Sequence, residues 1–161
     1  MKAAIIMGSD SDWPILKPAV DILKSFGIEA EVVVASAHRT PGKVRDFVLA
    51  APEKGISVFI VAAGAAAHLA GVVASYTTLP VIGVPINATA LNGMDALLST
   101  VQMPSGVPVA TMAINGAKNA AIFAVQIFAV GNAELADKLA AYREKMVEEV
   151  EKKAARVAAQ L

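Results

Sequence analysis

Between residues 55 and 117 the chain carries a single charged residue, Asp95. An apolar stretch of this length belongs inside a fold, at an interface or in a membrane. Residues 56–74 are apolar enough for a membrane-spanning helix, but two glycines and a histidine interrupt them, and alanine outnumbers the large aliphatic residues. We therefore expect a central strand, a loop of small residues and a helix, buried partly by the fold and partly by neighbouring subunits.

Short apolar runs without polar alternation recur along the chain, as is typical of parallel strands that are covered on both faces. A segment with helical character follows most of these runs. The expected strands are residues 3–7, 29–35, 58–63, 81–84 and 109–114, and the expected helices are 12–26, one opening at 41, one ending near 75, and 117–130. This alternation predicts right-handed crossovers and a doubly wound α/β fold with three layers.

Prolines and glycines set the expected boundaries of these elements. Asp12 is placed to cap the first helix and Gly27 to end it. Pro18 falls inside that helix, so we expect a kink there or a delayed start. Pro41 opens the second helix at a position where a missing N–H costs nothing, and Pro85 closes the fourth strand.

Residues 133–161 differ in character, because they carry 12 of the 28 charged residues of the chain. Glutamate and lysine stand four residues apart at 148 and 152 and again at 149 and 153. We predict one long amphipathic helix with a solvated polar face; docking against another subunit is the alternative role. The whole chain, residues 1–161, is expected to be one domain, with an α/β core over 1–132 followed by this helix.

The composition excludes several classes of function. Acidic and basic residues balance at 14 each, so the net charge favours neither nucleic acid nor a membrane surface as a partner. No cysteine is present, and the two histidines, 30 residues apart with no nearby acidic cluster, make a poor metal site. Met1 leads directly into an apolar run, without the basic flank of a signal peptide. We expect a cytoplasmic protein without a bound metal.

Two polar loops follow the first two predicted strands, at the edge where open parallel sheets bind ligands. His38 can give and take protons near neutral pH, and Arg39 offers a planar fork for phosphate. Taken alone, they are equally well explained as surface residues. In the earlier loop, Asp12 is either a helix cap or a ligand for ribose hydroxyls, and capping is the commoner use of such residues.

The second histidine, His68, stands among alanines after the third predicted strand. On its own it is best explained as a hydrogen-bonded core histidine. Three segments together give a different interpretation: Gly8-Ser9-Asp10-Ser11-Asp12, Ser36-Ala37-His38-Arg39-Thr40-Pro41 and Ala66-Ala67-His68-Leu69. With residues 80–85, 98–104, 106–111 and 119–121, they resemble the N5-carboxyaminoimidazole ribonucleotide mutase family in order and spacing over nearly the whole chain.

This resemblance implies a flavodoxin-like fold assembled as a homo-octamer. It also implies an isomerase of purine (IMP) biosynthesis, which interconverts N5-carboxyaminoimidazole ribonucleotide and 4-carboxyaminoimidazole ribonucleotide without a cofactor. His38 takes the family's proton-transfer role. The residues implied in binding the ribonucleotide substrate are Ser9, Ser11, Asp12, Ser36, Arg39, Gly64, His68 and Leu69.

Two alternatives remain open from the sequence. The related carboxylase class, which uses free carbon dioxide, generally lacks a segment like Ala66 to Leu69; a non-catalytic nucleotide-binding module is the alternative from another class. The chain also departs from the family pattern, because Ala63, Ala65 and Ala70 stand where the family usually has glycine or proline. The added methyl groups are expected to narrow the pocket.

Overall fold

The computed structural model describes residues 1–160 and contains one five-stranded, entirely parallel sheet. Its order is β2-β1-β3-β4-β5. The chain adds β2 on one side of β1 and then adds β3, β4 and β5 in turn on the other side. This is a doubly wound order, so the predicted flavodoxin-like α/β fold is confirmed. The strands are β1 (Lys2–Met7), β2 (Glu29–Val34), β3 (Ile56–Gly64), β4 (Val81–Ile86) and β5 (Ala110–Thr111).

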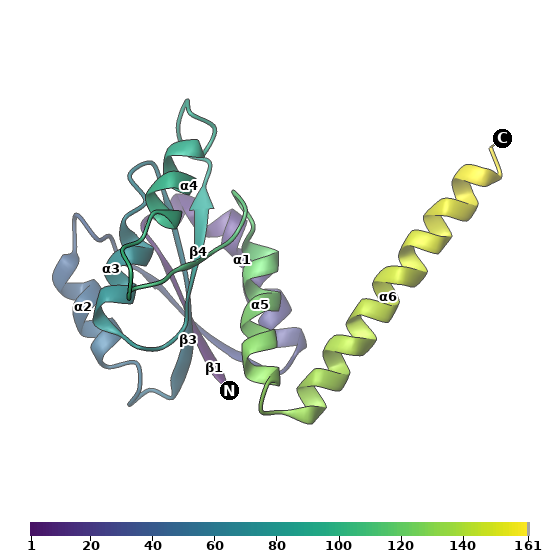
Figure 1. Cartoon of the computed structure of the whole chain (residues 1–161), viewed down its shortest axis with the longest axis horizontal. Helices are drawn as coiled ribbons and strands as arrows, with labels where there is room; N and C mark the ends of the chain where they lie inside the picture. Colours follow the sequence, from purple (N-terminus) through teal and green to yellow (C-terminus); the bar gives the residue numbers. More distant parts are fainter. Residues whose placement is uncertain (161) are drawn as a thin grey trace. The chain divides into compact units, whose positions relative to one another are not determined.

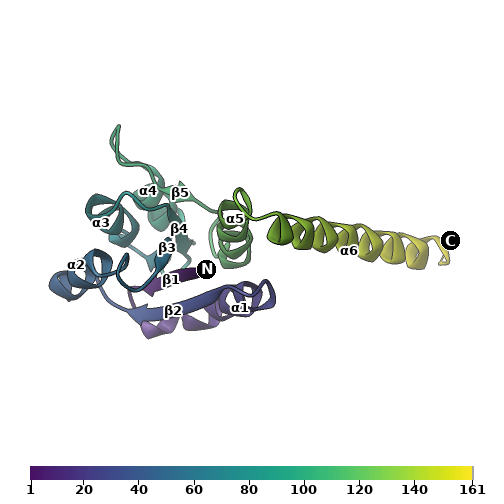
Figure 2. The same cartoon turned by 90° about the horizontal axis from the view of Figure 1, so that it is seen from below.

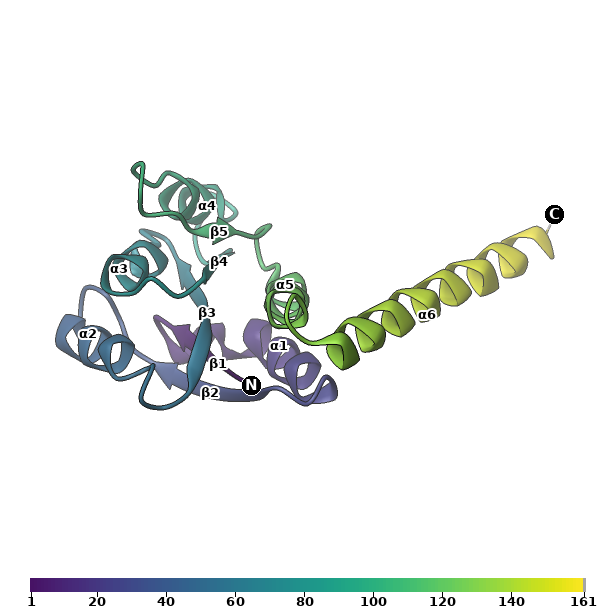
Figure 3. The same ribbon diagram turned by 60° about the horizontal axis from the view of Figure 1, so that its bottom comes forward.

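The helices lie on both faces of this sheet. Helices α2 and α3 pack over one face, whereas α1 lies over the other (Figures 1 and 3). Contacts divide the chain into two compact units, Met1–Ala124 and the part from Val125 onward. The helices are a short 3-10 helix η1 (Asp10–Asp12), α1 (Trp13–Ser25), α2 (Pro41–Leu49), α3 (Leu69–Tyr76), α4 (Met94–Val101), α5 (Ala117–Ala129) and α6 (Ala133–Ala158).

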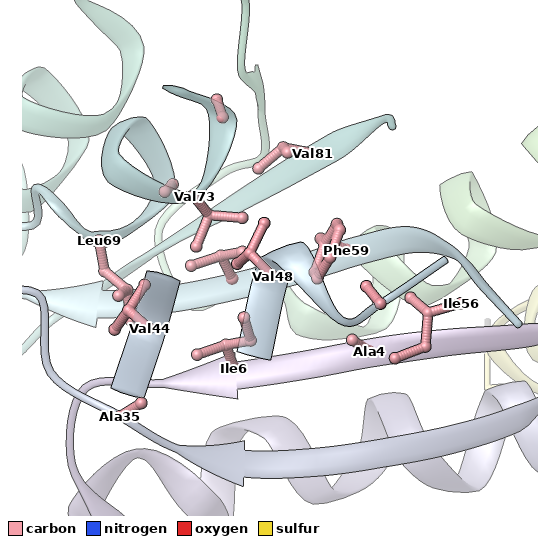
Figure 4. Close-up of a cluster of buried hydrophobic side chains, with 14 residues drawn as sticks. Ala4, Ile6, Ala35, Val44, Val48, Ile56, Phe59, Leu69, Val73 and Val81 are labelled. Atoms are coloured by element: carbon pink, nitrogen blue, oxygen red, sulfur yellow. The ribbon is translucent and has the colours of Figure 1, made fainter. Parts of the chain in front are cut away.

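A hydrophobic cluster between the sheet and helices α2 and α3 holds the first unit together. Phe59 of β3 is completely buried there, and Val48 of α2 and Val73 of α3 pack into the same cluster (Figure 4). Strand β1 is buried on both faces, since all residues from Ala3 to Met7 are at most 1% exposed. This two-sided burial explains why the strand is a continuous apolar run in the sequence.

Helix α1 shows two departures from expectation. It starts at Trp13 and continues through Pro18, so the alternative of a start delayed by this proline is wrong. Pro14 in the first turn needs no N–H partner and helps to fix that start. Asp12 does occupy the N-cap position, but its side chain makes no capping hydrogen bond. Ser9 caps η1 instead, accepting a hydrogen bond from the Ser11 N–H at 3.3 Å.

The last two strands also differ from expectation. Pro85 does not close β4 but lies within it, opposite Ala63 of β3. Strand β5 pairs only with Ile82 and Gly83 of β4. The missing N–H of Pro85 therefore costs no hydrogen bond between β4 and β5. The chain beyond β5 is irregular, and it keeps contact with β4 through a hydrogen bond from the Asn115 N–H to the Pro85 carbonyl at 2.8 Å.

Helix α6 of the second unit is one uninterrupted helix, as predicted for this segment (Figure 2). Asn132 caps it by accepting a hydrogen bond from the Leu135 N–H at 3.0 Å. The predicted ion pair between Glu148 and Lys152 is present at 3.8 Å. Across residues 1–160, no helix combines the length and apolarity needed to cross a membrane.

Candidate active site

The first four strands end side by side, which brings the loops that follow them together. Met7 of β1 pairs with Val34 of β2 and Ala62 of β3, and Ala62 pairs with Val84 of β4. A hollow of about 330 Å³ opens beyond this row, at the carboxyl edge of the sheet. Its lining residues are Gly8, Ser9, Ser11, Asp12, Ser36, Ala37, His38, Arg39, Ala63, Gly64, Ala65, Ala66, Leu69 and Ala88.

The loop after β1 supplies hydroxyl groups. Ser11 Oγ donates to Ser9 Oγ at 2.9 Å, so the two hydroxyls lie next to each other at the rim of the hollow. The backbone offers fewer free donors than a helix start usually does, because the Asp12 N–H donates to the Ser9 carbonyl and Pro14 has no N–H. At this rim, hydrogen-bond donors come mainly from side chains.

The loop after β2 is a tight turn held at both ends. The Ser36 N–H donates to Thr40 Oγ1 at 2.9 Å, and the Arg39 N–H donates to Ser36 Oγ at 3.2 Å. Arg39 reaches back across the site, where its Nη2 donates to the Gly8 carbonyl at 3.0 Å. The guanidinium group thus lies beside the serine loop, and a phosphate in this place would meet a positive charge and two hydroxyls.

The loop after β3 is compact and strained. Ala65 adopts a φ of 52°, in the left-handed region that favours glycine. Gly64 has no room for a side chain, because a Cβ atom would lie 2.6 Å from Cβ of Ala88 in the loop after β4. Buried Ala67 and Leu69 anchor the end of the loop and leave His68 between them exposed. The backbone at Gly64 and the side chain of Ala88 in the loop after β4 therefore lie close together.

The two histidines of the chain come together at the mouth of the hollow. His38 Nε2 lies 3.0 Å from His68 Nδ1, within hydrogen-bond distance. The rings meet edge to face, with centroids 5.1 Å apart and an interplanar angle of 88°. The sequence gives no sign of this contact, since 30 residues separate the two positions.

Asp12 is the one acidic side chain in the lining of the hollow, and it is 5% exposed. Burial raises the pKa of Asp12, against the opposing effect of the hydrogen bonds that it accepts from the loop. Ser11 Oγ lies 3.4 Å from Oδ1, and its one proton is shared between this carboxyl and the shorter contact with Ser9 Oγ. A buried carboxylate with spare acceptor capacity suits the hydroxyl groups of a sugar.

Comparisons with known proteins show the family and the fold of this chain. A family model described as AIR carboxylase matches residues 2–149. The chain belongs to the AIR carboxylase family. Two relatives are N5-carboxyaminoimidazole ribonucleotide mutases: that of Thermotoga maritima is 54% identical over 97% of this chain and 91% of the relative, and that of Saccharolobus solfataricus is 56% identical over 92% and 94%. The crystal structure of Treponema denticola PurE superposes with a TM-score of 0.85 at 28% identity, covering 96% of this chain and 97% of that one.

In this member of the AIR carboxylase family, eight of the nine residues singled out from the sequence line the hollow, and His68 joins them through His38. Ala88 is a lining residue that sequence reasoning missed. Its position in the sequence could have indicated this role, because Ala88 lies two residues after the end of β4 and the loops that follow the other strands form the site. Among residues 1–160, no three histidine, cysteine or acidic side chains are grouped to hold a metal ion.

Proposed function

We propose that the protein is an isomerase that converts N5-carboxyaminoimidazole ribonucleotide to 4-carboxyaminoimidazole ribonucleotide in purine biosynthesis. The observation that carries the proposal is the hollow itself. It combines an imidazole, a guanidinium group, three serine hydroxyls and a buried carboxylate at the carboxyl edge of the sheet. The high identity to named mutases over nearly the whole chain supports the same reaction.

The protein binds the nucleotide at its phosphate and its ribose, away from the reacting ring. Arg39, with the hydroxyls of Ser9 and Ser11, binds the 5′-phosphate, and Ser36 contributes a further polar group in the same turn. Asp12 accepts hydrogen bonds from ribose hydroxyls. Binding at the phosphate and the sugar places the ring near His38 and supplies positioning energy that the small reacting group lacks.

The chemistry moves a carboxyl group and two protons. The bond between the exocyclic nitrogen and the carboxyl carbon breaks, releasing carbon dioxide beside the aminoimidazole. Ring carbon 4 then attacks this carbon dioxide, and His38 takes the proton from carbon 4, which restores aromaticity. The exocyclic nitrogen takes a proton from His38 as its bond to the carboxyl carbon breaks, and His38 regains one from carbon 4, so the proton count is unchanged and no cofactor takes part.

Carbon dioxide must stay in the site between these steps. The wall formed by Gly64, Ala65, Ala66 and Leu69 presents backbone and small apolar groups, and Ala88 closes it from the neighbouring loop. The side chains of this wall offer the gas no polar group, and their apolar surface disfavours water next to the reacting atoms. The segment around His68, which is like that of the mutase class, favours this internal transfer over capture of dissolved gas.

We further propose that the protein acts as a homo-octamer in the cytoplasm. Helix α4 and the turn before it leave four large apolar side chains between 47% and 64% exposed in the single chain, namely Leu91, Met94, Leu98 and Val101. Their region is almost free of charge. Apolar surface of this kind is commonly covered by another subunit.

Ultraviolet absorbance provides the test of catalysis. On mixing with 4-carboxyaminoimidazole ribonucleotide or its N5 isomer, an isomerase changes the spectrum with time, whereas a binding module does not. We expect His38→Asn to lose at least about 100-fold in turnover, as on removal of a general acid–base group, and to melt within a few degrees of the parent. A parent protein that binds the nucleotide without any spectral change would contradict the proposal, and retained turnover in His38→Asn would exclude this histidine from proton transfer.

A further inference from the structure

The contact between the two histidines has a consequence beyond the presence of both in the site. Within residues 1–160, His68 is the group that meets the His38 ring, through Nε2 at 3.0 Å and an edge-to-face contact. Both side chains are exposed. A hydrogen bond between exposed groups adds little to folding stability. Its effect is therefore sought in the orientation of the His38 ring.

The backbones of the two residues are fixed independently of their rings. The turn from Ser36 to Thr40 holds His38, with hydrogen bonds of 2.9 Å from the Thr40 N–H to the Ser36 carbonyl and from the Ser36 N–H to Thr40 Oγ1. His68 opens α3, where its N–H donates to the Ala66 carbonyl at 2.8 Å and its carbonyl accepts from the Val72 N–H at 2.9 Å. The remaining freedom of His38 is the rotation and tautomer of its ring.

The hydrogen bond restricts the rotation of the His38 ring and couples its tautomer to that of His68. If His38 Nε2 carries the proton, it donates to a bare His68 Nδ1; if His38 Nε2 is bare, His68 Nδ1 donates to it. In each case Nε2 of His38 is occupied, the two ring planes lie at 88° to each other, and Nδ1 is the nitrogen left for substrate. An imidazole that must meet one carbon atom of a bound ring gains from such orientation.

We propose that His68 is a positioning residue that fixes the orientation of the His38 ring, and couples its tautomer to that of His68, in the substrate-free site. The inference rests on the proposed proton-transfer role of His38. It assigns His68 no proton of the reaction, and it replaces the substrate contact that the resemblance implies for this residue. Replacing His68 should therefore slow turnover moderately rather than abolish it, and should leave substrate affinity nearly unchanged.

Two variants separate the hydrogen bond from the bulk of the ring. His68→Phe keeps an aromatic ring but removes Nδ1, whereas His68→Asn places an amide atom near the former position of Nδ1. We expect kcat of His68→Phe to fall about five-fold, equivalent to about 1 kcal/mol of barrier, with KM within about two-fold of the parent, and His68→Asn to recover most of the loss. Equal kcat in all three proteins, or a loss confined to KM, would overturn the proposal.

Nitrogen-15 NMR of the histidine rings at alkaline pH gives a readout that does not depend on activity. In the parent, we expect the His38 Nε2 shift to be that of a ring nitrogen hydrogen-bonded to His68; in His68→Phe, it should move to that of a ring nitrogen exposed to solvent. Unchanged His38 shifts in His68→Phe would overturn the positioning role even if the protein proves to be a mutase. The expected shifts in a protein without mutase activity would leave the contact established and remove only the proposed reaction.

Discussion

The strained alanine in the wall of the hollow allows a quantitative test of the local structure. Ala65 has a φ of 52°, whereas its neighbour Ala66 is not among the residues of 1–160 with positive φ. Both side chains are exposed, so replacing either with glycine removes little buried surface. The left-handed conformation costs an L-residue about 1–2 kcal/mol, and glycine in place of alanine costs about 0.5–1 kcal/mol in chain entropy.

These magnitudes predict opposite results for the two substitutions. Ala65→Gly relieves the strain but adds the entropic cost, for a net stabilisation of about 0–1.5 kcal/mol. Ala66→Gly has only the entropic loss, so its free energy of unfolding falls by about 0.5–1 kcal/mol. The entropic part cancels in the difference between the two variants, which should equal the strain itself, about 1–2 kcal/mol.

Urea unfolding at one fixed protein concentration measures this difference, and thermal melting should show it as a gap of about 2–8 °C for a chain of this size. Both variants keep the remaining residues of the loop, so each serves as the control for the other. If Ala65→Gly is no more stable than Ala66→Gly, the loop is not strained at this residue, and the argument for a tightly held wall beside His68 loses its support.

Three other predictions concern substrate binding and assembly. Burial raises the pKa of Asp12, so the ionised form is disfavoured in the folded state; Asp12→Asn should unfold at a higher urea concentration than the parent at pH 7, with an advantage that disappears as the pH falls through about 4, while nucleotide affinity decreases. Arg39→Lys keeps the charge but loses the planar fork, so affinity for the nucleotide should fall more than affinity for the dephosphorylated nucleoside; an unchanged ratio of the two would show that Arg39 does not contact the phosphate. Light scattering should give about eight times the chain mass of 16.6 kDa, and a monomeric mass would mean that the exposed apolar face of α4 is not covered by another subunit.

The sequence predicts the sheet well because its central strands are buried on both faces. A strand such as β3, with Val58 to Ala62 completely buried, appears in the sequence as an unbroken apolar run. The position of polar residues directly after such runs was enough to predict that the loops meet at one edge. Eight of the candidate residues share a hollow for this reason.

Other features depend on tertiary contacts that leave no periodic signal. Strand β5 is an edge strand of two residues, and its irregular continuation follows β4 through single hydrogen bonds. Helix α4 follows a turn in which Asn92 and Gly93 both have positive φ, and its eight residues are too few for a clear pattern. The contact between His38 and His68 is set by side-chain directions at the ends of two different loops, which sequence spacing does not report.

The source of the carboxyl group tests the central claim most directly. Carbon dioxide released beside the ring has an effective concentration that dilute dissolved gas cannot match. We therefore expect turnover of N5-carboxyaminoimidazole ribonucleotide without added bicarbonate, and only slow entry of labelled bicarbonate into the product. Efficient turnover of aminoimidazole ribonucleotide with bicarbonate at ordinary concentrations, together with failure on the N5 compound, would contradict the mutase account and assign the carboxylase reaction instead.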